Sequence, residues 1–266
     1  MVVQARLFLA AHMDEPESAA LGHGQLSVYS RGGPEREGPN EDGAAYFQLG
    51  PRHVVLAVTD GVGGARGGAQ ATEEGLRCLA ERLAQVGDDP DRSREAILSA
   101  IEEANERIEA WGTGAGTTLA LAELWDDQVR TYHVGDSLVL GAEKRGGLRF
   151  QTVPHSPVGF AYEHGLLDEH EAMHHEDRHL IFNMLGTTEM RIEVSPALPF
   201  ESGDTLLLAS DGLFDNLWME EIVSRLGGRD PLSIARALVE LARRRMQEAR
   251  GEDPHKPDDL SLIVWR

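Results

Sequence analysis

The sequence predicts an α+β fold, a four-layer αββα sandwich in which two antiparallel sheets pack together and helices cover their outer faces. Short runs of apolar and β-branched residues recur along the chain, each of the length of a strand. Turns at residues 125–127 and 135–136 are too short to hold a crossover helix, which favours antiparallel pairing. The helical stretches each have a single apolar face, so they are expected to pack against a sheet.

The expected elements follow from these patterns in chain order. Residues 10–24 and 30–43 are expected to be loops, the second because it is dense in glycine, proline and charge. Apolar residues at helical spacing predict helices within residues 76–86, 97–111 and 234–241. The last helix is expected to begin at Asp230 and Pro231, an N-cap followed by proline at the first helical position. Strands are expected at residues 44–49, 53–59, 117–124, 128–134, 137–142, 148–153, 204–210 and 260–265.

Length and composition restrict the class of protein. The chain has 266 residues, 41% of them apolar and 26% charged, which is typical of a globular protein, and we expect one domain over residues 1–266. The formal net charge of -20 repels polyanions, so no nucleic-acid partner is expected. A single cysteine excludes an intrachain disulfide and suits a reducing compartment, so we expect a cytoplasmic protein. The longest apolar runs are strand-sized, so no membrane association is expected.

Four aspartates stand at the ends of predicted strands. Asp60, Asp136 and Asp211 each follow an apolar run and precede a glycine or serine, and Asp258 lies just before the final strand. One Asp-Gly pair by itself is most often an ordinary Asx turn. Several converging carboxylates repel one another unless a divalent cation neutralises them, and hard oxygen ligands suit magnesium or manganese. The recurrence of this pattern therefore favours a metal site.

A glycine-rich stretch at residues 61–68 follows the first of these aspartates. It lacks the lysine and hydroxyl residue of a nucleotide-binding loop, which disfavours a nucleoside triphosphatase. Glycine also permits a backbone to approach a cation closely, so the carbonyl oxygen of Gly61 is a candidate metal ligand.

Six short motifs succeed one another along most of the chain. They are Asn-Glu-Asp at residues 40–42, Asp-Gly-Val-Gly-Gly at 60–64, Gly-Thr-Thr at 116–118, Gly-Asp-Ser at 135–137, Ser-Asp-Gly-Leu-Phe-Asp at 210–215 and Asp-Asp-Leu-Ser at 258–261. In order and approximate spacing they resemble the metal-dependent protein serine/threonine phosphatases of the PPM family (protein phosphatase 2C-like), bacterial type. The resemblance covers a core at residues 26–266.

The resemblance implies hydrolysis of phosphoserine and phosphothreonine in proteins at a binuclear centre of Mn²⁺ or Mg²⁺. Two cations lower the pKa of a bound water, which attacks phosphorus in line without a phosphoenzyme. The metal ligands that the resemblance implies are Asp60, the Gly61 carbonyl, Asp211 and Asp258, and the three aspartates are the catalytic residues. Glu41 and Asp42 are the implied neighbours that order metal-bound water. Asp136 and Asp215 are candidates for binding a possible third cation.

The chain departs from the family pattern at the phosphate-binding arginine. This residue is expected just before the Asn-Glu-Asp motif, where the chain has Glu37. Arg36, one residue earlier, is the first candidate for this role and Arg31 the second, because the guanidinium fork matches phosphate oxygens.

The resemblance also implies a flap at residues 146–190, with a short helix at 168–173, where substrates are selected. Six histidines between His155 and His179 suggest that protonation near neutral pH could modulate substrate binding. Phosphorylated proteins and a cognate serine/threonine kinase system are the expected partners of a monomeric enzyme without a sensor domain or membrane anchor of its own.

Two alternatives belong to other functional classes. His175, Glu176 and His179 fit the zinc-peptidase pattern His-Glu-x-x-His, although the two positions between Glu176 and His179 carry full charges. The second alternative is a phosphoprotein-binding regulatory module with weak turnover, which the displaced arginine leaves open.

Overall fold

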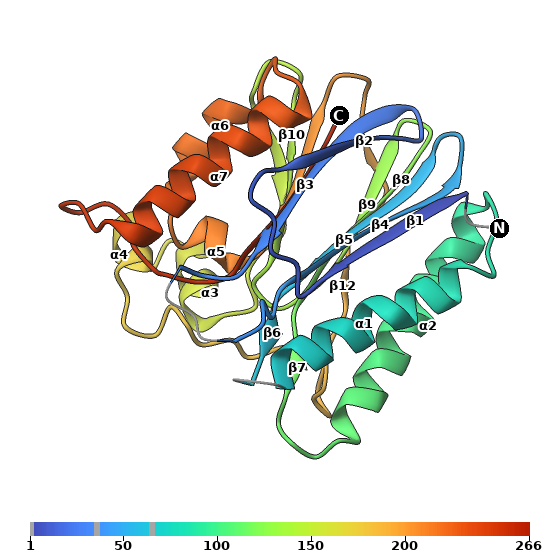
Figure 1. Ribbon diagram of the computed structural model, residues 1–266, viewed down its shortest axis with the longest axis horizontal. Coiled ribbons are helices and arrows are strands. Elements are labelled where there is room, and N and C mark those ends of the chain that lie inside the picture. Colours follow the sequence, from blue (N-terminus) through green and yellow to red (C-terminus); the bar gives the residue numbers. More distant parts are fainter. Residues whose placement is uncertain (1–2, 35–37, 64–66) are drawn as a thin grey trace.

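The computed structural model describes residues 3–34, 38–63 and 67–266. Two sheets pack face to face and helices cover both outer faces (Figure 1), which confirms the expected αββα sandwich. All pairings within the sheets are antiparallel.

The strands form two large sheets and one small one. The first sheet has the order β1 (Gln4–Leu9), β4 (Gly43–Gly50), β5 (His53–Thr59), β8 (Leu119–Trp125), β9 (Gln128–Val134) and β12 (Glu193–Val194), with β13 (Leu198–Pro199) also paired to β9. The second has the order β11 (Leu148–Gln151), β10 (Leu138–Ala142), β14 (Thr205–Ala209), β15 (Leu260–Trp265), β3 (Gly24–Arg31) and β2 (Glu17–Leu21). The short strands β6 (Gly61–Val62) and β7 (Gly116–Thr117) pair with each other.

Successive side chains of a strand point to opposite faces of the sheet and pack into different layers. In β5, Val55 and Ala57 pack toward the helices, whereas Leu56 and Val58 pack toward the second sheet. Because both faces of this strand are covered, its sequence is continuously apolar. The helices are α1 (Gly67–Leu83) and α2 (Pro90–Glu109) on the first sheet, α5 (Asp211–Phe214), α6 (Met219–Leu226) and α7 (Pro231–Gln247) on the side of the second, and α3 (Pro157–Glu163) and α4 (Glu169–Met173).

The helix starts follow capping chemistry. The Asp230 carboxylate accepts a hydrogen bond from the backbone N–H of Ser233, and Pro231 is the first residue of α7, as the sequence predicts.

The helix predicted within residues 97–111 ends at Glu109, so Trp111 lies beyond it and is 38% exposed.

Two expectations about loops are wrong. Residues 10–24 contain β2, an edge strand of small and charged residues that pairs with β3 and so carries no apolar run of its own. The short segment at residues 135–136 does not join paired strands: β9 lies in the first sheet and β10 in the second, so the chain crosses between the sheets here. Gly135 has φ +102°, which only glycine adopts without strain, and this conformation turns the chain toward the other sheet.

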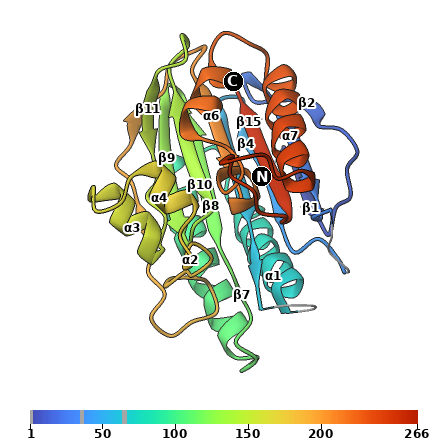
Figure 2. The same ribbon diagram turned by 90° about the vertical axis from the view of Figure 1, so that its left-hand side faces the viewer.

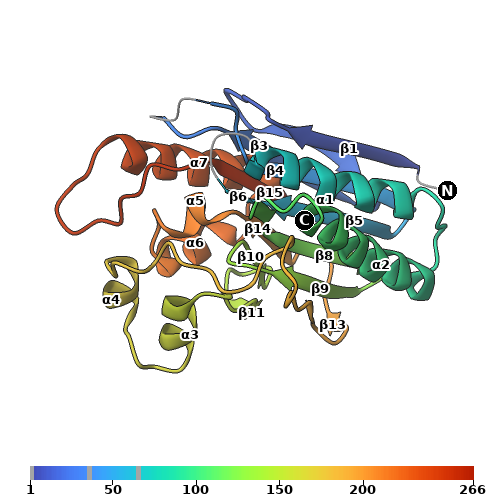
Figure 3. The same ribbon diagram turned by 90° about the horizontal axis from the view of Figure 1, so that it is seen from below.

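The segment at residues 146–190 is divided between sheet and helices. Its strand β11 pairs with β10. Helices α3 and α4 stand outside the two sheets, next to α5 and α6 (Figures 2 and 3). The expected helix at 168–173 is confirmed as α4, which Asp168 and Glu171 begin with a reciprocal capping box.

Within the described part of the chain, no helix is both long enough and apolar enough to span a bilayer.

Candidate metal centre

Strand register brings the predicted ligands to one end of the sandwich. Gly43 of β4 pairs with Thr59 of β5, so Asp42 and Asp60 are neighbours in the first sheet. In the second sheet, Ala209 pairs with Leu262, which places Asp211 and Asp258 at the corresponding end of β14 and β15.

One hydroxyl joins the two halves of the cluster. Ser210 donates from Oγ to Oδ2 of Asp42 across 2.7 Å, and the same Oγ accepts the backbone N–H of Ser261 at 3.0 Å. Asp60 and Asp211 are also close enough for the charge of Asp211 to raise the pKa of Asp60. The motifs that are far apart in the sequence therefore form a single cluster of carboxylates.

Glycine is required where backbones meet beside this cluster. A Cβ at Gly61 would lie 2.4 Å from the backbone of Gly68 and 2.8 Å from the carbonyl oxygen of Glu41. A Cβ at Gly212 would lie 1.9 Å from the carbonyl oxygen of Asp259. These glycines let the first turns of α1 and α5 approach the strand ends that carry the aspartates.

The cluster is electrostatically unfavourable in the absence of cations. Burial raises the pKa of Asp60 well above its ordinary value, and the charges of Asp211 and Asp42 raise it further. The same causes, burial first and Asp211 second, raise the pKa of Asp136 to about 8 and that of Asp258 to about 7.

Two other carboxylates follow the same trend. Burial and then the charge of Asp259 raise the pKa of Asp42 well above its ordinary value. Burial also raises the pKa of Asp215, against the lowering effect of Lys256. Asp211 is the exception: burial opposes its charge, but Lys256 and several hydrogen bonds outweigh burial and lower its pKa.

Buried carboxylate oxygens in the cluster fit a cation. Oδ1 of Asp42 and Oδ1 of Asp211 are both buried and have no hydrogen-bond partner among the described residues. An acceptor left without a donor in the interior is costly. Hard oxygen donors of this kind are the ligands that magnesium and manganese prefer, so the donor set fits these ions.

Lys256 belongs to the cluster, although no sequence motif predicted it there. Its Nζ lies 2.5 Å from Oδ2 of Asp211, 2.7 Å from Oδ2 of Asp215 and 3.2 Å from Oδ2 of Asp258. Burial opposes its charge, but the three carboxylates outweigh burial and raise its pKa. A signal was present in the sequence, because Lys256 is one of only two lysines and precedes Asp258 by two residues.

Asp259 lies in the Asp-Asp-Leu-Ser motif, but the sequence patterns predicted no role for it in the site. Its Oδ2 accepts the backbone N–H of Glu41 at 2.7 Å and its Oδ1 accepts that of Gly33 at 2.8 Å. Thr72 donates from its hydroxyl to the Glu41 carbonyl at 2.8 Å. Asp259 thus fixes the loop before β4, and with it Glu41 and Asp42.

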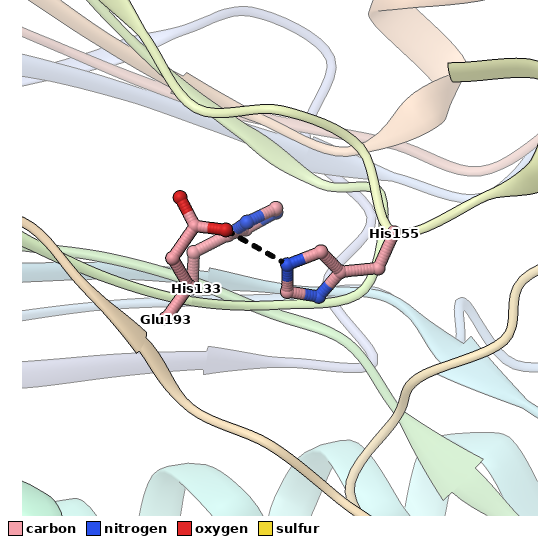
Figure 4. Close-up of side chains that lie close together, drawn as sticks. All are labelled: His133, His155 and Glu193. Atoms are coloured by element: carbon pink, nitrogen blue, oxygen red, sulfur yellow. Dashed lines mark hydrogen bonds and ion pairs between the residues drawn. The ribbon is translucent and has the colours of Figure 1, made fainter. Parts of the chain in front are cut away.

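Two histidines and a glutamate lie beside the turn that carries Asp136. Possible ligand atoms of His133, His155 and Glu193 lie within 4.8 Å of one another, and Figure 4 shows His155 directed at Glu193. Nδ1 of His155 accepts hydrogen bonds from the Gly135 N–H at 3.1 Å and the Asn183 amide at 2.8 Å. The proton of the neutral ring is therefore on Nε2, which donates to Glu193 at 3.2 Å.

This tautomer disfavours a metal at the histidine pair, because a ligating nitrogen must be unprotonated. Burial and the neighbouring His155 lower the pKa of His133 to about 3, so this ring is neutral too. His155 and Glu193 form a hydrogen-bonded support, to which the backbone N–H of His155 adds a hydrogen bond to the Gly135 carbonyl at 2.8 Å. Both ring nitrogens of His133 are buried without a hydrogen-bond partner among the described residues.

The structure describes only one of the two candidate arginines. Arg36 lies outside the described residues. Arg31 pairs with Asp14 at 2.5 Å and donates to the carbonyl oxygen of Met13 at 3.2 Å. The side chain of Arg31 thus contacts the loop between β1 and β2, while its backbone pairs with Leu260 of β15.

The zinc-peptidase alternative lacks its helix. The helix α4 ends at Met173, before the motif, so His175 and His179 do not share a helical face. Nδ1 of His175 accepts the Asp177 N–H at 3.1 Å, and Nδ1 of His179 lies 2.9 Å from the Glu176 carbonyl. These local contacts leave the motif without the geometry of a peptidase site.

The other histidines of α4 pack rather than face the cluster. The ring centroids of His170 and Trp218 are 6.1 Å apart with nearly parallel planes, and His174 stacks on His170 at 4.4 Å. Glu169 accepts the backbone N–H of Met219 at 2.6 Å. These contacts dock α4 on the start of α6.

A cavity of about 130 Å³ lies between the carboxylates and the helices α3 and α4. Asp136, Asp211 and Asp215 line one side of it. Its remaining wall is largely apolar and comprises, among others, Val158, Tyr162, Met173, Phe214, Leu217 and Met219.

Comparisons with known proteins agree with this architecture. A family model described as "Protein phosphatase 2C" matches residues 34–249. The serine/threonine phosphatase stp of Listeria monocytogenes is 31% identical over 196 residues, which cover 69% of this chain and 77% of that protein. The structure of the S. agalactiae serine/threonine phosphatase superposes with a TM-score of 0.78 at 25% identity, covering 91% of this chain and 99% of that one.

A solved structure that contains metal is also similar. It is the catalytic domain of the serine threonine protein phosphatase PstP in complex with 2 manganese ions. Its TM-score is 0.71 at 26% identity, and the match covers 90% of this chain and 96% of that one.

Proposed function

The chain belongs to the protein phosphatase 2C family, and from this premise we propose that it hydrolyses phosphoserine and phosphothreonine in proteins at a binuclear manganese or magnesium centre. The observation that carries the metal-dependent part of this proposal is the carboxylate cluster, whose raised pKa values and unpartnered oxygens at Asp42 and Asp211 call for cations. The manganese complex of the similar PstP domain supports the choice of metal.

The proposed ligands are Asp60, the Gly61 carbonyl, Asp211 and Asp258. When bound, two divalent cations supply a water that is nucleophilic at neutral pH and neutralise charge on the phosphate. Ser210 and Asp259 hold the loops that carry Asp42 and Glu41, so these two acidic side chains are fixed where they can accept hydrogen bonds from water.

Substrate recognition is proposed to involve two further parts of the chain. Arg36 is proposed to pair with the phosphate, because the guanidinium fork matches its oxygens. The flap, residues 146–190 of the single domain 1–266, is proposed to select substrates through the cavity beside Asp136 and Asp215. Phosphoproteins made by a serine/threonine kinase are the proposed substrates, and a cytoplasmic monomer is the proposed form.

Metal add-back to stripped protein tests this function. We expect phosphate release from a phosphothreonine peptide with Mn²⁺ or Mg²⁺ and none with chelator. Asp60→Asn is expected to lower turnover at least about a hundredfold, because the amide supplies a weaker and uncharged ligand. Asp127→Asn is a matched control, since Asp127 pairs with Arg52 at the other end of the sheet, near the His53–Trp125 pair.

Each other outcome has a definite meaning. Undiminished turnover in excess chelator, or in Asp60→Asn, would contradict the metal-dependent mechanism. Folded protein that binds Mn²⁺ and phosphopeptide without releasing phosphate would indicate the binding-module alternative.

A further inference from the structure

The ammonium group of Lys256 donates hydrogen bonds to Asp211 and Asp215 and forms an ion pair with Asp258. A lysine ammonium carries three protons and accepts nothing. Its three carboxylate neighbours, Asp211, Asp215 and Asp258, lie at 2.5, 2.7 and 3.2 Å from Nζ. All four side chains are mostly buried, so the contacts are little screened by solvent.

The backbone of Lys256 is fixed by a buried asparagine. Asn216, which is fully buried, accepts the Lys256 N–H at 2.9 Å and donates to the Lys256 carbonyl at 2.8 Å. The same amide nitrogen donates to the Gly212 carbonyl at 3.0 Å. The lysine is thereby tied to α5, the helix that carries Asp211 and precedes Asp215.

The flanking residues are tied down as well. Arg178 donates to the carbonyl oxygen of His255 at 2.9 Å. The buried Arg245 pairs with Asp253 at 3.2 Å and donates to the Asn216 carbonyl at 2.8 Å. The position of the ammonium is therefore built into the scaffold and does not depend on a loose surface side chain.

We propose that the Lys256 ammonium, which contacts Asp211, Asp215 and Asp258, is the resident cation on the Asp215 side of the cluster, in the place that a third divalent ion would otherwise take. The inference rests on the proposed binuclear function and refines it: the chain binds two divalent ions and supplies the third positive centre itself. A divalent ion that used Oδ2 of Asp211 and of Asp215 would compete directly with the ammonium for both oxygens. The lysine therefore makes this end of the cluster independent of metal concentration.

Counting bound Mn²⁺ tests the proposal without measuring activity. The electron paramagnetic resonance signal of free Mn²⁺, followed during titration of metal-stripped protein, gives the number of ions bound. We expect two ions for the wild type and three for Lys256→Met, which keeps an unbranched side chain of similar shape but removes the ammonium group and its charge. The double variant Lys256→Met/Asp215→Asn is expected to return to two.

The chain offers a matched control, since its other lysine, Lys144, is exposed. Lys144→Met is expected to bind two ions, like the wild type. If Lys256→Met does not fold, as judged by circular dichroism, Lys256→Gln is measured in its place. The number of Mn²⁺ ions bound by the wild type tests the proposal whichever variant is used.

The outcomes separate this inference from the proposed function. Three ions in the wild type, or two in a folded neutral variant at position 256, would overturn the role of Lys256 while leaving the metal centre intact. No Mn²⁺ bound by the wild type would instead overturn the metal-dependent function on which the inference rests.

Discussion

The stability of the metal-free protein is predicted to fall as the pH rises, because folding buries carboxyls that prefer to be protonated. Asp258 illustrates the size of the effect: its pKa is about 7 in the folded chain, against an ordinary value of 3.8 for an aspartate. Between about pH 4 and pH 7 the unfolded chain therefore binds one proton less at this residue. Stability then falls by about 1.4 kcal/mol per pH unit, until the folded carboxyl also ionises.

For Asp258 alone, raising the pH from 5 to 7 is expected to lower the free energy of unfolding by about 2 kcal/mol. Asp60, Asp42 and Asp136 act in the same direction, since their pKa values are also raised. Asp211, whose pKa is lowered, contributes stability that is already complete above pH 5. Saturating Mn²⁺ stabilises the ionised carboxylates, so stability is then expected not to fall over this range.

Urea unfolding in chelator at pH 5, 6 and 7, repeated with Mn²⁺, measures both dependences. Asp258→Asn cannot ionise at this position, and its loss of stability between pH 5 and 7 is expected to be smaller by about 2 kcal/mol. Asp127→Asn, at the opposite end of the sheet, is the control with the wild-type slope. A metal-free wild type whose stability is constant or rises with pH would refute the electrostatic reasoning.

Two further predictions concern close packing and a buried charge. Gly212→Ala places a methyl group against the Asp259 carbonyl, so it is expected to lower the free energy of unfolding by about 3 kcal/mol and to weaken Mn²⁺ binding. Gly147→Ala is the control, because this position has room for a Cβ and its stability is expected to be that of the wild type. Equal melting temperatures of the two variants would contradict this. Glu123 is fully buried and accepts a hydrogen bond from the Tyr132 hydroxyl at 2.8 Å. Glu123→Ala is therefore expected to lower the free energy of unfolding by about 3 kcal/mol, and a loss below about 1 kcal/mol in urea unfolding would show that the carboxylate adds little.

Local sequence was sufficient for the central strands and for the aspartates at their ends. The predicted bounds of residues 53–59, 128–134 and 260–265 are those of β5, β9 and β15. Strands β5 and β15 are covered on both faces and so carry apolar runs, whereas β9 is marked by β-branched and aromatic residues between two turns. The predicted cluster residues Asp60 and Asp211 lie together because each follows such a strand, and the register of neighbouring strands aligns their ends.

Edge elements could not be identified in this way. The strand β2 owes its conformation to hydrogen bonds with β3, and its sequence of small and charged residues carries no period that marks a strand. The crossing at Gly135 depends on which strands β9 and β10 pair with, and pairing is a long-range property. The helix α3 lies in a segment expected to be one flap, and its start at Pro157 is stabilised by the Ser156 side chain.

The sequence by itself determined the layered fold, the family resemblance and the identity of the converging carboxylates, because these depend on local periodicity and on residues placed directly at strand ends. Only the tertiary structure showed that a positively charged side chain of the chain itself, Lys256, contacts these carboxylates. Lys256 reaches Asp215 across 41 positions of the sequence, and Asp259 reaches Glu41 across 218. Hydrophobic periodicity does not predict contacts of this range: the first forms when β14 pairs with β15 within the second sheet, and the second forms when the two sheets pack together.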